Sequence, residues 1–155
     1  MENYNQIKTI DLKDTIRLYK SHNVYNHLSK DDVAQHIIPS VALNQYKVFR
    51  YDNTGVAYAF TNWAFLNNEV QERYKLTGVL DKFDWDSGKN CWHIDTVNTA
   101  YNKLTEIYNW TASYFSKLLT DDEYFNWLRL DKTGQKVKRV NRIIASNGKK
   151  KFLKE

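Results

Sequence analysis

The 155-residue sequence is poor in three residue types that shape small folds, with one cysteine, one proline and five glycines. The single cysteine, Cys91, excludes an internal disulfide framework. The shortage of proline and glycine favours long regular elements joined by few sharp loops. The sequence has no run of about 18 apolar residues and no charged-then-apolar leader, so we expect a cytoplasmic protein without a membrane span.

What is present favours a packed globule. Hydrophobic residues make up 42% of the chain and aromatic residues 15%, which is too much apolar surface for a disordered protein. The length suits one hydrophobic core without staples. We therefore expect a single domain over residues 1–148, followed by a basic C-terminal tail over residues 149–155.

The net charge of +5 is concentrated near the C-terminus. Nine Lys or Arg and one acidic residue lie between Lys132 and Glu155. Such a segment either binds nucleic acid, an acidic protein or an anionic surface, or is simply a solvated end. The five tryptophans also suggest nucleic-acid binding, but no RNP-like or helix-turn-helix pattern supports it. At helical or alternating spacing such rings are more typical of a core, so nucleic acid is not an expected partner.

Hydrophobic periodicity predicts helices and strands in a mixed order. The expected elements are helices over 11–20, from a Ser29 cap through Ile37, over 67–76 and over 100–119, and strands over 45–51, 56–66, 91–97, 124–130 and 135–144. In the long helix, Ile107 and Phe115 belong to an apolar stripe that should be buried. This order predicts an α+β protein with a mainly antiparallel sheet.

The most informative stretch is Asp84–Asp95, which reads DWDSGKNCWHID. A polar turn leads into an alternating strand, in which Trp92 and Ile94 share one face and His93 and Asp95 share the other. Two titratable side chains on one face can work together. A strand histidine such as His93 is nevertheless more often structural than catalytic.

The residue types and spacing of this stretch resemble a known sequence signature. Asp-Trp-x-Ser-Gly, followed after four residues by hydrophobic-Ile-Asp, resembles the central signature of the toxin-activating lysine acyltransferases, which fatty-acylate internal lysines of RTX-type protoxins. Further matching segments are Pro39 with Asn44-Gln45-Tyr46, Val56-Ala57-Tyr58 with Trp63-Ala64, and Arg129-Leu130-Asp131. Two or three residues, Phe60 to Asn62, are extra relative to the family. The resemblance spans roughly residues 18–148.

The resemblance implies an acetyltransferase-like fold, with a mixed, mainly antiparallel sheet flanked by helices and a splayed pair of strands that admits an acyl-pantetheine arm. It implies acyl carrier protein as the acyl donor, no permanently bound cofactor, a protoxin-like protein substrate and a homodimer. The basic residues expected to contact an acidic carrier are Lys136, Lys138, Arg139 and Arg142.

Lysine acylation needs a base for the amine, and a carboxylate that orients the base. The resemblance assigns the carboxylate to Asp95. The family's catalytic histidine precedes its proline, and counting back from Pro39 without gaps places Tyr25 at that position. We predict His27 as a displaced base and His22 as the second candidate, although both also suit a polar surface loop. Tyr25 is a candidate hydrogen-bond donor to the oxyanion.

The expected function is therefore a protein-lysine acyltransferase that uses acyl carrier protein. The alternative is a catalytically degenerate binding or inhibitory protein on the same fold, because Tyr25 stands where the family has its histidine. Cys91 lies early in its strand and is expected to be an apolar filler. Four histidines and one cysteine without paired spacing predict no zinc site.

Overall fold

The computed structural model describes residues 2–23, 25–130, 137–145 and 152–154. The elements in this part of the chain are α1 (Glu2–Ser21), α2 (Lys30–Ala42), β1 (Tyr46–Arg50), β2 (Ala57–Leu66), α3 (Asn68–Thr77), β3 (Asn90–Asn98), α4 (Leu104–Leu118), β4 (Tyr124–Leu130), β5 (Val137–Ala145) and β6 (Phe152–Lys154). The predicted order is confirmed, and β6 is an addition that the sequence patterns did not predict. None of the helices in these ranges is both long enough and apolar enough to cross a bilayer.

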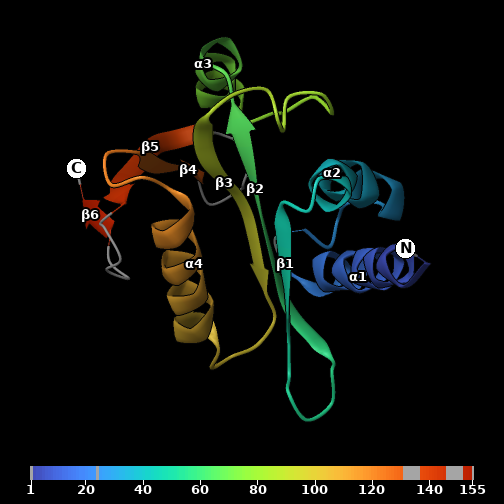
Figure 1. Cartoon of the computed structure of the whole chain (residues 1–155). Helices are drawn as coiled ribbons and strands as arrows, with labels where there is room; N and C mark the ends of the chain where they lie inside the picture. The colour runs from blue at the N-terminus through green and yellow to red at the C-terminus, as the bar shows by residue number, and fades with distance from the viewer. Residues whose placement is uncertain (1, 24, 131–136, 146–151, 155) are drawn as a thin grey trace. The chain divides into compact units, whose positions relative to one another are not determined.

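The strands form one sheet in the order β1-β2-β3-β4-β5-β6 (Figure 1). The β1–β2, β4–β5 and β5–β6 pairs are antiparallel, whereas β3 pairs with β4 in parallel, over Cys91–His93 and Phe125–Trp127. This mixed, mainly antiparallel sheet with helices confirms the predicted α+β class and is compatible with an acetyltransferase-like fold.

The chain groups into two compact units, which are described separately. The first unit comprises Met1–Trp63 and Asp95–Ala100, and the second comprises Ala64–Ile94 and Tyr101–Glu155. The predicted boundary between a domain and a tail at residue 148 stays a prediction, because residues 146–151 lie outside the described ranges.

The first unit packs α1 and α2 side by side, next to the β1–β2 hairpin (Figure 1). Its core consists of Leu18, Tyr19, Val33, Ile37, Ala57, Phe60 and Val97. Helix α2 begins as predicted, because the backbone N–H of Asp32 donates to the Ser29 hydroxyl at 3.0 Å. This cap satisfies one of the N–H groups that lack a partner within the helix.

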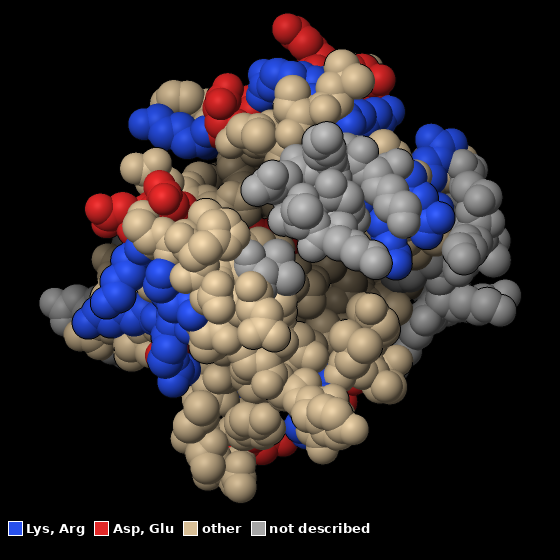
Figure 2. All heavy atoms as spheres, turned by 180° about the vertical axis from the view of Figure 1, so that it is seen from behind, with Lys and Arg blue, Asp and Glu red and all other residues tan. Residues whose placement is uncertain are grey.

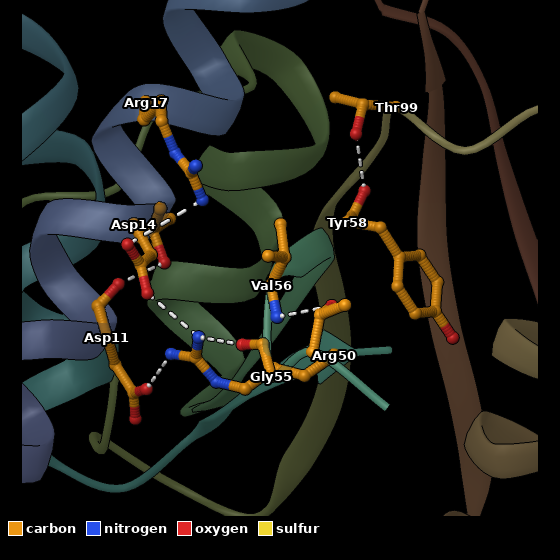
Figure 3. A network of polar contacts seen from close by, with 10 residues as sticks. Asp11, Asp14, Arg17, Arg50, Gly55, Val56, Tyr58 and Thr99 are labelled. Atoms are coloured by element: carbon orange, nitrogen blue, oxygen red, sulfur yellow. Dashed lines mark hydrogen bonds and ion pairs between the residues drawn. The ribbon is translucent and has the colours of Figure 1, made fainter. Parts of the chain in front are cut away.

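Arg50 of β1 binds two carboxylates of α1, which holds α1 to the hairpin (Figure 3). The Arg50 guanidinium donates to Asp11 Oδ1 at 2.7 Å and to Asp14 Oδ2 at 2.8 Å. It also donates to the Gly55 carbonyl at 3.0 Å, inside the hairpin turn. Planar guanidinium donors suit such divided contacts, so Arg50 fixes α1 against β1.

The second unit has an aromatic core. Its buried cluster consists of Ala64, Leu66, Val70, Tyr74, Trp85 and Trp92. Ile107 and Phe115 of α4 are buried, at 1% and 0% exposure, which confirms the predicted stripe. The Phe115 ring lies 4.4 Å from the Phe125 ring of β4, measured between centroids.

The polar turn before β3 is structural. Backbone N–H groups of Ser87 and Gly88 donate to the Phe65 carbonyl, at 2.8 and 3.1 Å, and the Ser87 hydroxyl accepts from the backbone N–H of Asn67. A Cβ atom on Gly88 would lie 2.4 Å from the Asn67 Cα, so this close approach requires glycine. The first half of the signature therefore holds the end of β2 and the start of α3.

Candidate active site

A carboxylate on β3 is the meeting point of side chains from two helices. Asp95 Oδ2 accepts a hydrogen bond from the Tyr19 hydroxyl of α1 at 2.7 Å and lies 2.5 Å from Nε2 of His36 on α2. The Asp95 side chain is 11% exposed, whereas the His36 side chain is 43% exposed. All three residues belong to the first unit. The arrangement is a nearly buried carboxylate with one buried partner and one partner that solvent can reach.

Helical spacing explains how His36 reaches this position. Val33, Ile37 and Ser40 are buried and form the face of α2 that points to the core. His36 lies three residues after Val33 and beside Ile37, at the edge of this face. Its ring therefore reaches toward the sheet without being enclosed by the core.

Electrostatics in the site follow from the Asp95 charge and from burial. The charge of Asp95 raises the pKa of His36, and this effect outweighs the burial that opposes it. Burial, and then the charge of Asp95, raises the pKa of Tyr19 well above its ordinary value. The charge of Asp95, and then burial, raises the pKa of Tyr25. Both phenols therefore keep their protons at neutral pH and are hydrogen-bond donors.

The residues predicted for the site before Pro39, which are His22, Tyr25 and His27, lie in the turn that follows α1. Tyr25 is half-buried, and its ring lies 5.0 Å from the Tyr19 ring and 5.5 Å from the His22 ring, measured between centroids. His27 is exposed in the turn that follows α1. The histidine that the structure places within hydrogen-bond distance of Asp95 is His36, which sequence reasoning did not select.

The sequence did not indicate His36, because the family resemblance places the catalytic histidine in the loop before Pro39. The signal that was available is helical: His36 flanks the buried Val33–Ile37 stripe on a helix with a recognisable Ser29 cap. The choice of His27 or His22 as the base stays a prediction, and His36 now stands beside it with a geometric argument.

The Asn44–Tyr46 segment connects the elements that carry the site residues. Asn44 has a positive φ of 58°, which turns the chain out of α2. The Gln45 side-chain amide donates to the Trp63 carbonyl at 3.0 Å. The Tyr46 hydroxyl donates to Asp11 Oδ2 at 2.6 Å. This segment thus ties α2 to β2 and β1 to α1, which holds the helices that carry His36 and Tyr19.

Other chemical groups of β3 lie in the second unit. Cys91 is 1% exposed, and burial raises the pKa of its thiol, so the thiol stays protonated and is a poor nucleophile. The His93 ring lies 5.4 Å from the Phe125 ring, measured between centroids. Within the described ranges, no three His, Cys, Asp or Glu side chains group as metal ligands.

Comparisons with known proteins give matches to lysine acyltransferases that activate toxins. The sequence profile of the RTX toxin acyltransferase family matches residues 8–144. A leukotoxin-activating lysine-acyltransferase of Mannheimia haemolytica is 32% identical over 98 residues, which cover 59% of this chain and 58% of that protein. The protein-lysine myristoyltransferase HlyC of Escherichia coli is 30% identical over 100 residues, which cover 63% of this chain and 52% of HlyC.

A third relative comes from a cyanobacterium. An uncharacterized protein of Synechocystis is 26% identical over 109 residues, which cover 70% of this chain and 71% of that protein. The matched part of the chain spans between 52% and 58% of the length of the two acyltransferases named above.

Proposed function

The chain belongs to the RTX toxin acyltransferase family, and from this premise we propose that it is a protein-lysine acyltransferase, which moves a fatty acyl group from acyl carrier protein to internal lysines of a protein substrate. The observation that carries the proposal is the hydrogen bond between His36 and Asp95. It supplies the imidazole and carboxylate that this reaction needs, although Tyr25 occupies the position that the family resemblance gives to histidine.

In the proposed mechanism, Asp95 orients the imidazole of His36. The Nε2–H group donates to the carboxylate, so Nδ1 carries the lone pair and is the basic nitrogen. The nearby negative charge stabilises the imidazolium that forms when Nδ1 takes a proton. With 43% of its side chain exposed, His36 is accessible to a lysine of another protein.

The acyl transfer balances without another reagent. The neutral lysine amine attacks the thioester carbonyl carbon, the C–N bond forms, and the amine proton passes to His36 Nδ1. The tetrahedral intermediate collapses, the C–S bond breaks, and the carrier thiolate receives the proton from His36. The Tyr25 hydroxyl, which keeps its proton, is the proposed donor to the oxyanion.

The acyl donor is proposed to dock through basic side chains. Arg139 and Arg142 of β5 are exposed, and the Arg142 guanidinium lies 3.8 Å from the centre of the Tyr124 ring. Lys138 belongs to the same strand, and Lys136 lies outside the described residues. On the face drawn in Figure 2, Lys and Arg occur in several separate groups. An acidic carrier suits such a surface. A homodimer and a cytoplasmic location remain expectations from the resemblance and composition.

The proposal is tested with myristoyl-loaded acyl carrier protein as donor and a bacterial extract as the source of lysines, read by mass spectrometry of acylated peptides. The native chain should acylate lysines, and His36→Ala should slow the reaction by about 10²–10⁴-fold, the usual contribution of a general base. His93→Ala is the matched control and should retain activity, because His93 packs on Phe125 in the second unit.

Two comparisons decide between bases. If His27→Ala or His22→Ala abolishes activity while His36→Ala does not, the base lies in the loop. If His36 is the base, adding Tyr25→His to His36→Ala should restore part of the activity. The family resemblance places the catalytic histidine at position 25, and the charge of Asp95 raises the pKa of Tyr25. A chain that acylates nothing but binds the carrier would favour the degenerate binding protein.

A further inference from the structure

A buried amide in β2 joins the strand that carries Asp95 to the helix that carries His36. Asn62 is fully buried, and its Oδ1 accepts from the backbone N–H of Asp95 at 2.9 Å. Its Nδ2 donates to the Ser40 hydroxyl of α2 at 3.0 Å, and this hydroxyl donates to the Ile37 carbonyl at 2.9 Å. One side chain therefore links three elements of the first unit.

The two ends of this bridge coincide with the two ends of the candidate site. Ser40 lies four residues after His36, so both residues occupy neighbouring positions on α2. At the other end, Asn62 binds the backbone of the residue that bears the carboxylate. Any change in the length or direction of the bridge would alter the spacing between imidazole and carboxylate.

The neighbouring residue completes the hold on Asp95. The Thr61 hydroxyl donates to the Asp95 carbonyl at 2.9 Å, and Thr61 is fully buried. Side chains of two successive β2 residues thus bind both backbone polar groups of Asp95. Thr61 and Asn62 are adjacent in β2, so one short segment holds the backbone of the residue that bears the carboxylate.

A polar bridge of this kind is costly to bury unless each group is paired. An amide in an apolar core loses free energy of solvation, and only complete hydrogen bonding compensates for this loss. A fully paired buried network favours one geometry over its alternatives. Leucine would fill the same region without this requirement, so the choice of asparagine at position 62 indicates a role in geometry rather than in bulk packing.

We propose that Asn62 is a positioning residue, which sets the spacing between the Asp95 carboxylate and the His36 imidazole by binding β3 and α2 at once. The proposal rests on the proposed acyl transfer for its catalytic consequence. The positioning itself does not depend on the identity of the reaction.

The test replaces Asn62 with leucine and follows the His36 imidazole by NMR across a pH titration. Loss of the bridge should loosen the contact with Asp95, so the pKa of His36 should fall toward the ordinary histidine value. In myristoyl transfer, kcat should drop by up to about 10²-fold with little change in KM, as expected for a misplacement of about 1 Å. The pH profile of kcat should shift to lower pH.

Asn126→Leu is the matched control for stability. Asn126 is also a buried amide, but it belongs to the second unit, where its side chain donates to the Cys91 carbonyl at 2.9 Å. This variant should lose stability without a change in the His36 titration. Ser40→Ala, which breaks only the α2 end of the bridge, should lower the His36 pKa less than Asn62→Leu does.

The outcomes separate the two proposals. A folded Asn62→Leu chain in which His36 titrates as in the native protein would overturn the positioning role, whatever its activity. If the native chain has no transferase activity but Asn62→Leu still shifts the His36 titration, the positioning role is supported and the acyltransferase function is refuted. If Asn62→Leu does not fold, the Ser40→Ala titration decides: an unchanged His36 pKa there overturns the proposal.

Discussion

The two halves of β3 place their reactive side chains in different environments. In the first half, Cys91 and Trp92 are 1% and 0% exposed and lie in the second unit. Burial, and then the charge of Glu123, raises the pKa of the Cys91 thiol and keeps it protonated. The second half begins with Asp95, whose carboxylate binds Tyr19 and His36. The comparison indicates that convergent donors, rather than burial, distinguish the candidate site.

The signature that includes both halves also serves two purposes. Ser87 and Gly88 bind the end of β2, and Gly88 has no space for a Cβ atom. These residues determine local structure in the second unit. Asp95, at the other end of the signature, is the acceptor in the candidate site. A short sequence signature can therefore combine a structural turn and a chemical group in a few residues.

The largest expected effect comes from Asp95→Asn, which keeps the side-chain volume but removes the charge that stabilises the imidazolium. Myristoyl transfer should fall by about 10²–10⁴-fold, while circular dichroism stays native. Cys91→Ala is the counterpart in the other half of the strand and should retain the native rate. Full activity in Asp95→Asn, or a large loss in Cys91→Ala, would reverse the comparison.

In the second unit, Ile107→Ala should lower the free energy of unfolding by about 2–5 kcal/mol, because it leaves a cavity beneath α4. Urea unfolding measures this change. Tyr108→Ala is the matched surface variant, since Tyr108 is 62% exposed, and should change stability by less than about 0.5 kcal/mol. Equal effects of the two substitutions would show that the assigned helix register is wrong.

A third prediction concerns pH. The charge of Asp95 raises the pKa of His36 above its unfolded value of about 6.5. The stability that this pair contributes is therefore complete below the unfolded pKa and is lost as pH rises through the folded pKa. Activity should rise over the same range, because the base must be neutral. Asp95→Asn should move the His36 titration to lower pH, and an unmoved titration would refute the coupling.

The smallest expected effect is at the start of α2. Ser29→Ala removes the side-chain acceptor for the backbone N–H of Asp32 and should cost about 1 kcal/mol in thermal or urea unfolding. Ser29→Asp is the control that keeps an acceptor and should restore this stability. The His36 titration should stay native in both variants, and a shifted titration would show that the cap contributes to the geometry of the site.

Patterns with a local cause were predictable from the sequence. The Ser29 cap, the buried stripe with Ile107 and Phe115, and the Tyr124–Leu130 strand follow from residues close together in the chain. Strand β6 was not predicted, because the lysine-rich sequence around Phe152–Lys154 has no alternating pattern of its own, and its pairing with β5 is a tertiary contact.

The sequence by itself determined the family, the α+β order and the position of Asp95 in a strand, because sequence motifs and hydrophobic periodicity depend on residues that are close together in the chain. Only the tertiary structure decided which side chains meet that carboxylate. His36 is 59 positions from Asp95 and Tyr19 is 76 positions away. The Asn62 bridge likewise spans 33 positions to Asp95 and 22 to Ser40. Such contacts depend on how helices pack on the strands, and no local pattern specifies that packing.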